Sequence, residues 1–325
     1  MSERHGIAVG GTILVDKINE LSAYPEIGEL TKIKSVSYAI GGCVPNVGLD
    51  LKKLRPTLDV LAIGKIGKDS NGEFALNTLK AGNLDTSGII ENGNDATSFT
   101  EVMSVTNGQR TFFTYPGASS DLGFNDINFD AINSKILHLG YFLLLDKIDA
   151  GDGLKILKKA KECGIKTSID LVSENSDRYS LVIPCLKYTD YLIVNEIEAS
   201  NIAGFEPLDE NLKEIAEKLM SLGVREKVII HKSDRAVALS NDGFTTLPAL
   251  DIPSEKIKGT TGAGDAFCAG ALLAIYDGKS DREILDFASS VALVSLFSKD
   301  ATSGIVCEEK VKEISKEYGR KKYVS

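Results

Sequence analysis

The sequence predicts an α/β fold built on a mostly parallel β-sheet with helices covering both faces. Short apolar or β-branched runs alternate with stretches of helical periodicity along most of the chain. The 325 residues, 43% of them hydrophobic and 26% charged, are enough for one large domain with a full core. We therefore expect a single α/β domain over residues 1–325.

The order of the predicted elements supports this fold class. The predicted buried strands span 7–11, 58–64, 135–141, 165–171, 190–195 and 227–232. Helical spacing predicts helices over 47–54, 72–82, 153–164 and 211–223, with Gly82 and Gly164 as terminating glycines. Ligands of such sheets bind beyond the carboxyl ends of the strands, so functional residues are expected there.

Two segments do not follow the strand–helix alternation. Residues 12–40 and 97–116 resemble strands joined by turns, and the NGQ at 107–109 sits between alternating runs, as in a hairpin. We expect the two segments to form a small β-sheet that acts as a lid over the strand ends. The alternative is a pair of edge hairpins on the main sheet.

Composition restricts the partners. The net charge is -9 and the only basic run is the GRKKY tail, so nucleic acid is not expected as a partner. The longest apolar runs are far too short to span a membrane, and the first residues lack the apolar region of a signal peptide. Five cysteines without a CxxC spacing favour reduced thiols and a cytoplasmic location.

The segment TTGAGDAF contains the strongest chemical signal. A loop ending at Thr261 followed by a helix from about Ala263 would leave the first amides of that helix without partners, next to the positive end of its dipole. Gly262 and Gly264 let a phosphate approach those amides closely. Asp265 in the first turn could then take a proton from an alcohol while the amides hold the phosphoryl group. The alternative is a glycine-rich turn with Asp265 at a helix N-terminus.

A second cluster, AIGGCVPN, offers contacts for a hydroxylated ligand. Gly41 and Gly42 allow a tight backbone path before a helix, and Asn46 offers both a donor and an acceptor to a sugar hydroxyl. Asn46 could instead cap the helix, with Pro45 just before it. Asp16, just after the first strand, could accept hydrogen bonds from ligand hydroxyls or be a solvated turn residue.

A third cluster lies at the junction YLIVNEIEA. Asn195 and Glu198 are three residues apart, the spacing of a capping box, so a purely structural role is open. They could also face phosphates and order a hydrated Mg²⁺, which prefers oxygen ligands and retains water. In GKIGKDSNGEF, Asp69 could contact a ligand or close a turn.

Together, TTGAGDAF, GGCVPN, GKIGKD and NEIEA resemble the PfkB carbohydrate kinase family, also called the ribokinase-like family, over residues 7–306. The resemblance implies a three-layer sandwich with a β-sheet lid. It also implies that Asp265 is the general base and that the amides of Gly262, Ala263 and Gly264 form an anion hole. It implies that Asn195 and Glu198 position Mg²⁺ and phosphate. It implies sugar contacts from Asp16, Gly42 and Asn46, with Gly41 beside them. We also assign Thr261 and Ser233 to the nucleotide and phosphate site.

Some residues depart from the family pattern. Gly259 stands where potassium-activated members carry an aspartate, so monovalent-cation activation is an open question. The loop HKSDRAV has Ser233 and Ala236 where glycines are common, which leaves the phosphate-donor preference open. Leu14 and Gly140 stand at positions where ribokinases have asparagine and an acidic residue, so ribose is not the leading substrate.

These observations predict an ATP- and Mg²⁺-dependent kinase that phosphorylates a primary hydroxyl of a small sugar or sugar acid. A lid of this kind can pair between subunits, which suggests a homodimer. One alternative is a nucleoside kinase on the same fold, with Phe112, Phe113 and Tyr115 as an aromatic slot for the base. The other is a sugar-binding regulator without catalysis, which would not need a base beside an anion site.

Overall fold

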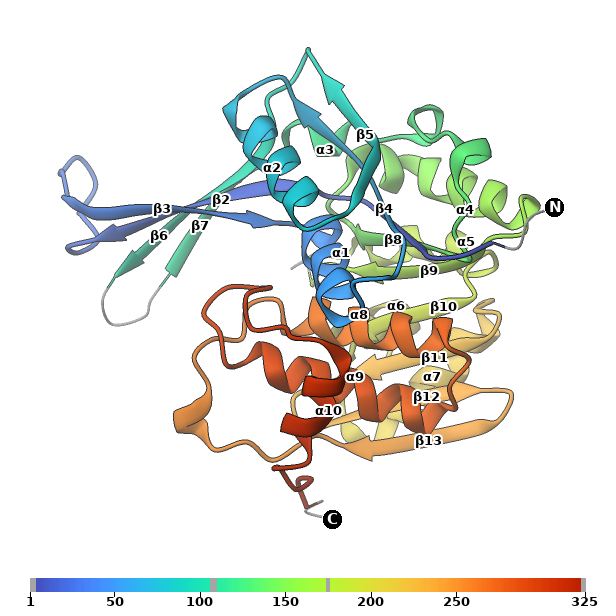
Figure 1. Cartoon of the computed structure of the whole chain (residues 1–325). Helices are drawn as coiled ribbons and strands as arrows, with labels where there is room; N and C mark the ends of the chain where they lie inside the picture. The colour runs from blue at the N-terminus through green and yellow to red at the C-terminus, as the bar shows by residue number, and fades with distance from the viewer. Residues whose placement is uncertain (1–3, 106–109, 174–175, 323–325) are drawn as a thin grey trace.

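The computed structural model describes residues 4–105, 110–173 and 176–322, which form a nine-stranded sheet and a separate four-stranded sheet. The large sheet has the order β13-β12-β11-β10-β9-β8-β1-β4-β5 (Figure 1). Its strands from β11 to β5 all pair in parallel, and only the two pairings of β12, with β11 and with β13, are antiparallel, which confirms the predicted α/β class. The strands are β1 (Ile7–Gly10), β4 (Val60–Gly67), β5 (Asp85–Asn92), β8 (Ile136–Phe142), β9 (Lys166–Leu171), β10 (Tyr191–Asn195), β11 (Lys227–His231), β12 (Arg235–Ser240) and β13 (Gly243–Pro248).

Helices cover both faces of the large sheet, so that alternate residues of each strand enter two separate cores. In β1, Ile7 and Val9 pack into one core while Ala8 packs into the other. The first core is covered by α1 (Cys43–Leu54), α2 (Ser70–Ala81), α8 (Ala263–Tyr276), α9 (Asp281–Ser295) and α10 (Glu308–Ser315). The second is covered by α4 (Gly153–Glu162), α5 (Ile183–Leu186), α6 (Glu196–Ala203) and α7 (Leu212–Ser221).

The small sheet consists of β2 (Leu14–Leu21), β3 (Ile33–Gly41), β6 (Ser98–Val105) and β7 (Arg110–Tyr115), in the order β3-β2-β6-β7. Two antiparallel pairs, β2–β3 and β6–β7, are joined by a parallel pairing of β2 with β6. It projects away from the large sheet (Figure 1). The segments 12–40 and 97–116 therefore form a sheet of their own, and the alternative of edge hairpins on the main sheet is wrong. The NGQ turn lies outside the described residues.

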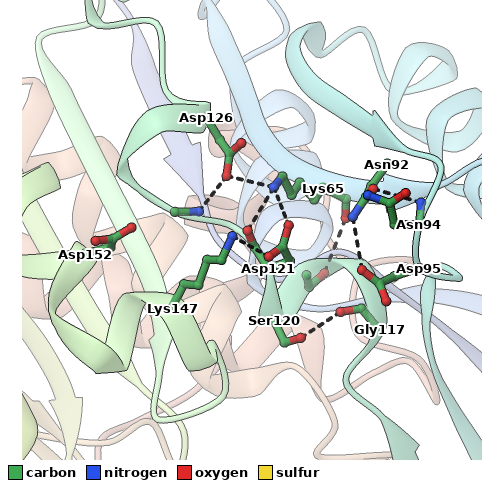
Figure 2. Close-up of polar contacts among 12 residues, drawn as sticks. Lys65, Asn92, Asn94, Asp95, Gly117, Ser120, Asp121, Asp126, Lys147 and Asp152 are labelled. Atoms are coloured by element: carbon green, nitrogen blue, oxygen red, sulfur yellow. Dashed lines mark hydrogen bonds and ion pairs between the residues drawn. The ribbon is translucent and has the colours of Figure 1, made fainter.

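Several buried polar contacts fix the base of the small sheet to the large one. The Ser119 hydroxyl, in α3 (Gly117–Ser120) after β7, accepts from the Ile13 amide at 3.1 Å and donates to the Ile13 carbonyl at 2.9 Å. The Lys65 ammonium of β4 donates to Asp121 Oδ2 at 2.7 Å and pairs with Asp126 at 2.9 Å, while Lys147 pairs with Asp121 from the other side (Figure 2). These contacts hold the segment before β2 and the segment after β7 against the large sheet.

The contacts of the Asp69 side chain show its role in the fold. It caps α2 by accepting from the Gly72 amide at 2.8 Å, and it accepts from the Thr97 amide at 2.8 Å and the Thr97 hydroxyl at 2.6 Å. These bonds lower the pKa of Asp69 despite the opposing effect of burial. Asp69 therefore closes the turn before α2 and holds the start of β6, the simpler of the two predictions.

Most predicted elements are present, with differences at their ends. The first helix begins at Cys43 rather than Val47, and the strand predicted over 58–64 runs from Val60 to Gly67. Helix α2 ends at Ala81, and Asn83 rather than Gly82 has the positive φ, 60°. Gly164 follows α4 with φ 73°, as predicted. Within the described residues, no helix has the length and apolarity that crossing a bilayer requires.

Candidate active site

The N-terminus of α8 lies at the carboxyl edge of the large sheet, where ligands of this fold class bind. Gly262 precedes the helix with φ 77°, and a Cβ there would lie 2.5 Å from Ala301 Cβ, so only glycine fits. The Ala263 amide donates to the Thr260 carbonyl at 3.2 Å, whereas the amides of Gly262 and Gly264 have no backbone acceptor among the described residues. The glycine turn predicted before α8 is therefore present, and two of its three amides have no backbone acceptor in this conformation.

Asp265 is buried in the first turn of α8. Its Oδ2 accepts from Asn46 Nδ2 at 2.9 Å and from the Tyr141 hydroxyl at 3.0 Å. Burial and the nearby charge of Asp170 raise the pKa of Asp265 to about 7, against the opposing effect of the two hydrogen bonds. A carboxylate with this pKa exchanges protons at neutral pH, as a general base must.

Asn46 links α1 to Asp265. It lies inside α1, whose N-cap is Gly42, so the alternative in which Asn46 caps the helix is wrong. Its side-chain nitrogen donates to Asp265, and its Oδ1 is buried without a hydrogen-bond partner among the described residues. A buried acceptor left unpaired is costly to stability.

Gly41 and Asp16 lie together at the junction of the two sheets. Asp16 is in β2, paired with Ala39 of β3, so the prediction of a solvated turn residue is wrong. A Cβ on Gly41 would lie 2.8 Å from Asp16 Oδ2, which shows how close the two residues are. Burial raises the pKa of Asp16 to about 6, opposed by a hydrogen bond from Thr100.

Asn195 and Glu198 form the capping box that the spacing allowed. Asn195 Oδ1 accepts from the Glu198 amide at 2.9 Å, and Glu198 Oε2 accepts from the Asn195 amide at 3.0 Å. Glu198 Oε1 also accepts from Ser173 at 2.9 Å and from Asn195 Nδ2 at 2.8 Å. Burial raises the pKa of Glu198 to about 7, partly offset by these bonds. Since both carboxylate oxygens are engaged, Glu198 suits a hydrated cation held through water better than a directly bound one.

A cavity of about 320 Å³ brings many of these residues together; we call it the Asp265 cavity. Its lining includes Asp170, Asn195, Glu198, Gly262, Gly264 and Asp265. Among the described residues that line it there are three carboxylates and no lysine or arginine. The cavity therefore suits a polar ligand together with a cation, and oxygen ligands of this kind fit Mg²⁺.

A second, more apolar cavity of about 400 Å³ lies beside it; we call it the apolar cavity. Ser233 and Thr260 line it, together with Ala236, Leu250 and Phe267. The predicted nucleotide residue Thr261 is exposed and lines neither cavity. His231 and Gly264 line both cavities and so mark where they meet.

Three residues of the site were not predicted: Tyr141, Asp170 and His231. Each lies at or just before the carboxyl end of its strand, β8, β9 and β11 respectively. A polar residue at such a position in a buried strand was the signal available in the sequence. Asp170 Oδ1 accepts from the Tyr141 amide at 2.5 Å, and His138 Nε2 lies 3.3 Å from Asp170 Oδ2. A Cβ on Gly140 would lie 2.9 Å from Asp170 Oδ1, so the Asp170 carboxylate fills the space that a side chain at position 140 would need.

An α/β sandwich with a buried carboxylate at a helix N-terminus, in a cavity at the carboxyl edge of the sheet, has the architecture of an enzyme that acts on a small molecule. The family model "pfkB family carbohydrate kinase" matches residues 11–306. The chain belongs to this family and is therefore a carbohydrate kinase. The kinases of this family use ATP as the phosphate donor.

Individual relatives cover almost the whole chain. A 5-dehydro-2-deoxygluconokinase of Clostridium perfringens is 25% identical over 304 residues, 89% of each chain. An adenosine kinase of Saccharomyces cerevisiae is 25% identical over 307 residues, 90% of this chain and 88% of its own. The Arabidopsis thaliana ribokinase in complex with ribose and ATP is similar in structure, with a TM-score of 0.81 at 22% identity over 96% of this chain and 99% of its own. These matches confirm the predicted family and the predicted ribokinase-like fold.

Proposed function

We propose that this chain phosphorylates a primary hydroxyl of a small sugar or sugar acid with MgATP. The observation that carries the proposal is the position of Asp265: a buried carboxylate in the first turn of α8, beside free helix amides. Within this class the lining of the Asp265 cavity favours a neutral sugar, because three carboxylates and no cationic side chain surround it among the described residues.

In the proposed reaction Asp265 accepts the proton of the sugar hydroxyl as its oxygen attacks the γ-phosphorus. A new O–P bond forms, the bond from phosphorus to the β-phosphate bridging oxygen breaks, and ADP leaves. Asn46 and Tyr141 hold Asp265 Oδ2, which fixes the orientation of the carboxylate. Removal of such a base typically costs roughly 10²–10⁴-fold in rate. The amides of Gly262 and Gly264 stabilise the negative charge of the transferring group.

The nucleotide belongs, in this proposal, in the apolar cavity, with its base between Ala236, Leu250 and Phe267 and its phosphates directed toward Gly264. Mg²⁺ would neutralise phosphate charge when bound. Glu198 and Asn195, tied together in the capping box, hold its hydration shell, and Asp170 is a further carboxylate within the same cavity.

The small sheet is proposed to close over the sugar and exclude water. We also propose that it pairs with the small sheet of a second subunit, because both edge strands expose large apolar side chains: Ile33, Val36 and Tyr38 on β3, and Phe112, Phe113 and Tyr115 on β7. Light scattering after size exclusion should give a dimer, and a clean monomer would remove this part of the proposal. All five cysteines are free, in keeping with the cytoplasmic location that we propose.

The test of the function is ADP release from MgATP across a panel of sugars, sugar acids and nucleosides, with Asp265→Asn measured in parallel. Turnover of a sugar that falls at least about a hundredfold in the variant supports the proposal. Turnover of nucleosides alone would make this a nucleoside kinase, the activity that the adenosine kinase relative is named for. Ligand binding without turnover of any acceptor would make it a regulator.

A further inference from the structure

His231 lies at the boundary between the Asp265 cavity and the apolar cavity. It is the last residue of β11, and it lies next to Asn195, the last residue of β10, in the parallel register. A Cβ built on Gly264 would lie 3.6 Å from His231 Cε1, so the ring is close to the start of α8. Its other neighbour is the Phe267 ring, with the ring centres 4.8 Å apart.

The ring nitrogens of His231 have no hydrogen-bond partner among the described residues, and the ring packs between Gly264 and Phe267. Burial lowers the pKa of His231 to about 4, with Asp170 acting in the opposite direction. The imidazole is therefore neutral near pH 7, with one N–H donor and one acceptor nitrogen. A polar ring that lines two cavities and lacks a protein partner is placed to contact a ligand that extends through both.

Charge points to the ligand group that it would contact. The charged groups that face this region are Asp170, Glu198 and Asp265 on the side of the Asp265 cavity, and Glu196, Lys232, Arg235 and Lys321 on the side of the apolar cavity. The Lys321 ammonium donates to the Ser233 carbonyl at 2.9 Å. Lys232 is already paired with Asp209 and Asp234, and Arg235 with the same two aspartates. His231 is thus the only residue with a basic side chain that lines the Asp265 cavity among the described residues, so a phosphate there has few other side-chain donors.

We propose that His231 donates a ring N–H to the γ-phosphoryl group of the nucleotide as that group passes from one cavity to the other. This inference rests on the proposed kinase function and adds a residue to it. The contact is specific for the transferring group: it forms with a γ-phosphoryl group and not with ADP.

The experiment measures the binding of MgADP with and without beryllium fluoride, which takes the place of a γ-phosphoryl group and needs no sugar. His231→Phe keeps a ring against Phe267 but has no donor, His231→Gln keeps an N–H donor, and His5→Phe removes a histidine before β1 as the matched control. We expect beryllium fluoride to tighten nucleotide binding to the wild type and to the control. His231→Phe should lose about tenfold or more of that tightening, with unchanged affinity for MgADP alone. His231→Gln should regain part of it.

Kinetics with the accepted sugar gives a second measurement. His231→Phe should lower kcat with little change in the KM of the sugar, and the pH profile should keep its shape because the imidazole does not titrate near neutrality. Equal weakening of MgADP and of MgADP with beryllium fluoride would overturn the inference, since the ring would then contact the base or ribose. Equal losses in the Phe and Gln variants would also overturn it. If His231→Phe does not fold, His231→Leu takes its place.

These outcomes separate the inference from the function on which it rests. If the wild type binds MgADP and turns over a sugar but beryllium fluoride binding does not depend on His231, only the inference fails. If the wild type binds no nucleotide at all, the proposed function fails and the inference fails with it.

Discussion

The hydroxyl of Tyr141 provides a sensitive test of the proposed base. It donates to Asp265 Oδ2 at 3.0 Å, inside a cavity where hydrogen bonds to a charged group are strong. Burial and the nearby charge of Asp265 raise the pKa of Tyr141 well above its usual value, so the phenol stays protonated and remains a donor. Tyr141→Phe removes this one donor and leaves the Asn46 bond to the same oxygen in place.

The size of the effect follows from the lost bond. A hydrogen bond to a charged group contributes about 1.5–3 kcal/mol, and one pKa unit corresponds to about 1.36 kcal/mol. The pKa of Asp265, about 7 in the wild type, should therefore rise by roughly one to two units in the variant. Because the ionised form is the active one, a rise of one unit lowers the rate about fivefold at pH 7 and about tenfold at pH 6. The loss should disappear at pH well above the new pKa.

The assay is kcat/KM for the accepted sugar, measured from pH 6 to pH 9.5 with saturating MgATP. The acid limb of the profile should move to higher pH in Tyr141→Phe, with recovery at the alkaline end. The control is Tyr276→Phe, which removes a hydroxyl that accepts from the Gly6 amide next to β1. If Tyr141→Phe loses the same factor at every pH, the hydrogen bond does not tune Asp265 and the reasoning is refuted.

Three further predictions concern stability, metal and salt. The pKa of Asp265 is higher in the folded protein than in the unfolded chain, so ionisation of this carboxyl lowers the stability of the wild type as pH rises toward 7. Relative to the wild type, Asp265→Asn should therefore gain up to about 4 kcal/mol of unfolding free energy at pH 8 and much less at pH 5. Denaturant unfolding at the two pH values measures this difference. Glu198→Gln should keep the hydrogen bond from the Asn195 amide and the thermal stability of the wild type, but should need a higher Mg²⁺ concentration for activity. Glu198→Ala should in addition lose about 1 kcal/mol of unfolding free energy. Equal Mg²⁺ dependence of the wild type and the Gln variant would contradict a metal role. Since a Cβ on Gly259 would lie 2.8 Å from the Ser298 carbonyl, no aspartate fits there, and exchanging KCl for NaCl should leave the rate unchanged.

The fold could be predicted largely from the sequence because its elements carry local signals. The buried strands are continuous apolar runs, as in IAVG and YLIV, and their alternation with helices indicates a parallel sheet. Element ends were less accurate: α1 begins at Cys43, before the first apolar position with helical spacing, because Gly42 with φ 94° starts the helix rather than a polar cap. No periodicity reveals a start of that kind.

The site could be predicted only where a motif carried it. Asp265 and its glycines were found because their types and order are characteristic, and Asn46 was found beside two glycines. Tyr141 was missed because its role depends on a contact across 124 positions of the chain, between β8 and α8. Asp170 and His231 were missed for the same reason: their neighbours come from other strands, and single-sequence spacing does not reveal which strands lie side by side.

The parallel pairing of β2 with β6 has a consequence for how the chain folds. Leu14 pairs with Ser98, so α1, β4, α2 and β5 lie in sequence between the two strands. Contacts of such large sequence separation are slow to form, because the loop must be closed before the pairing stabilises it. We expect the β2 edge of the hairpin of β2 and β3 to stay unpaired during synthesis until the chain has extended past Tyr115, the end of β7. Because this late pairing joins its two hairpins, the small sheet should open before the large one, and its amides should be the first to exchange with solvent.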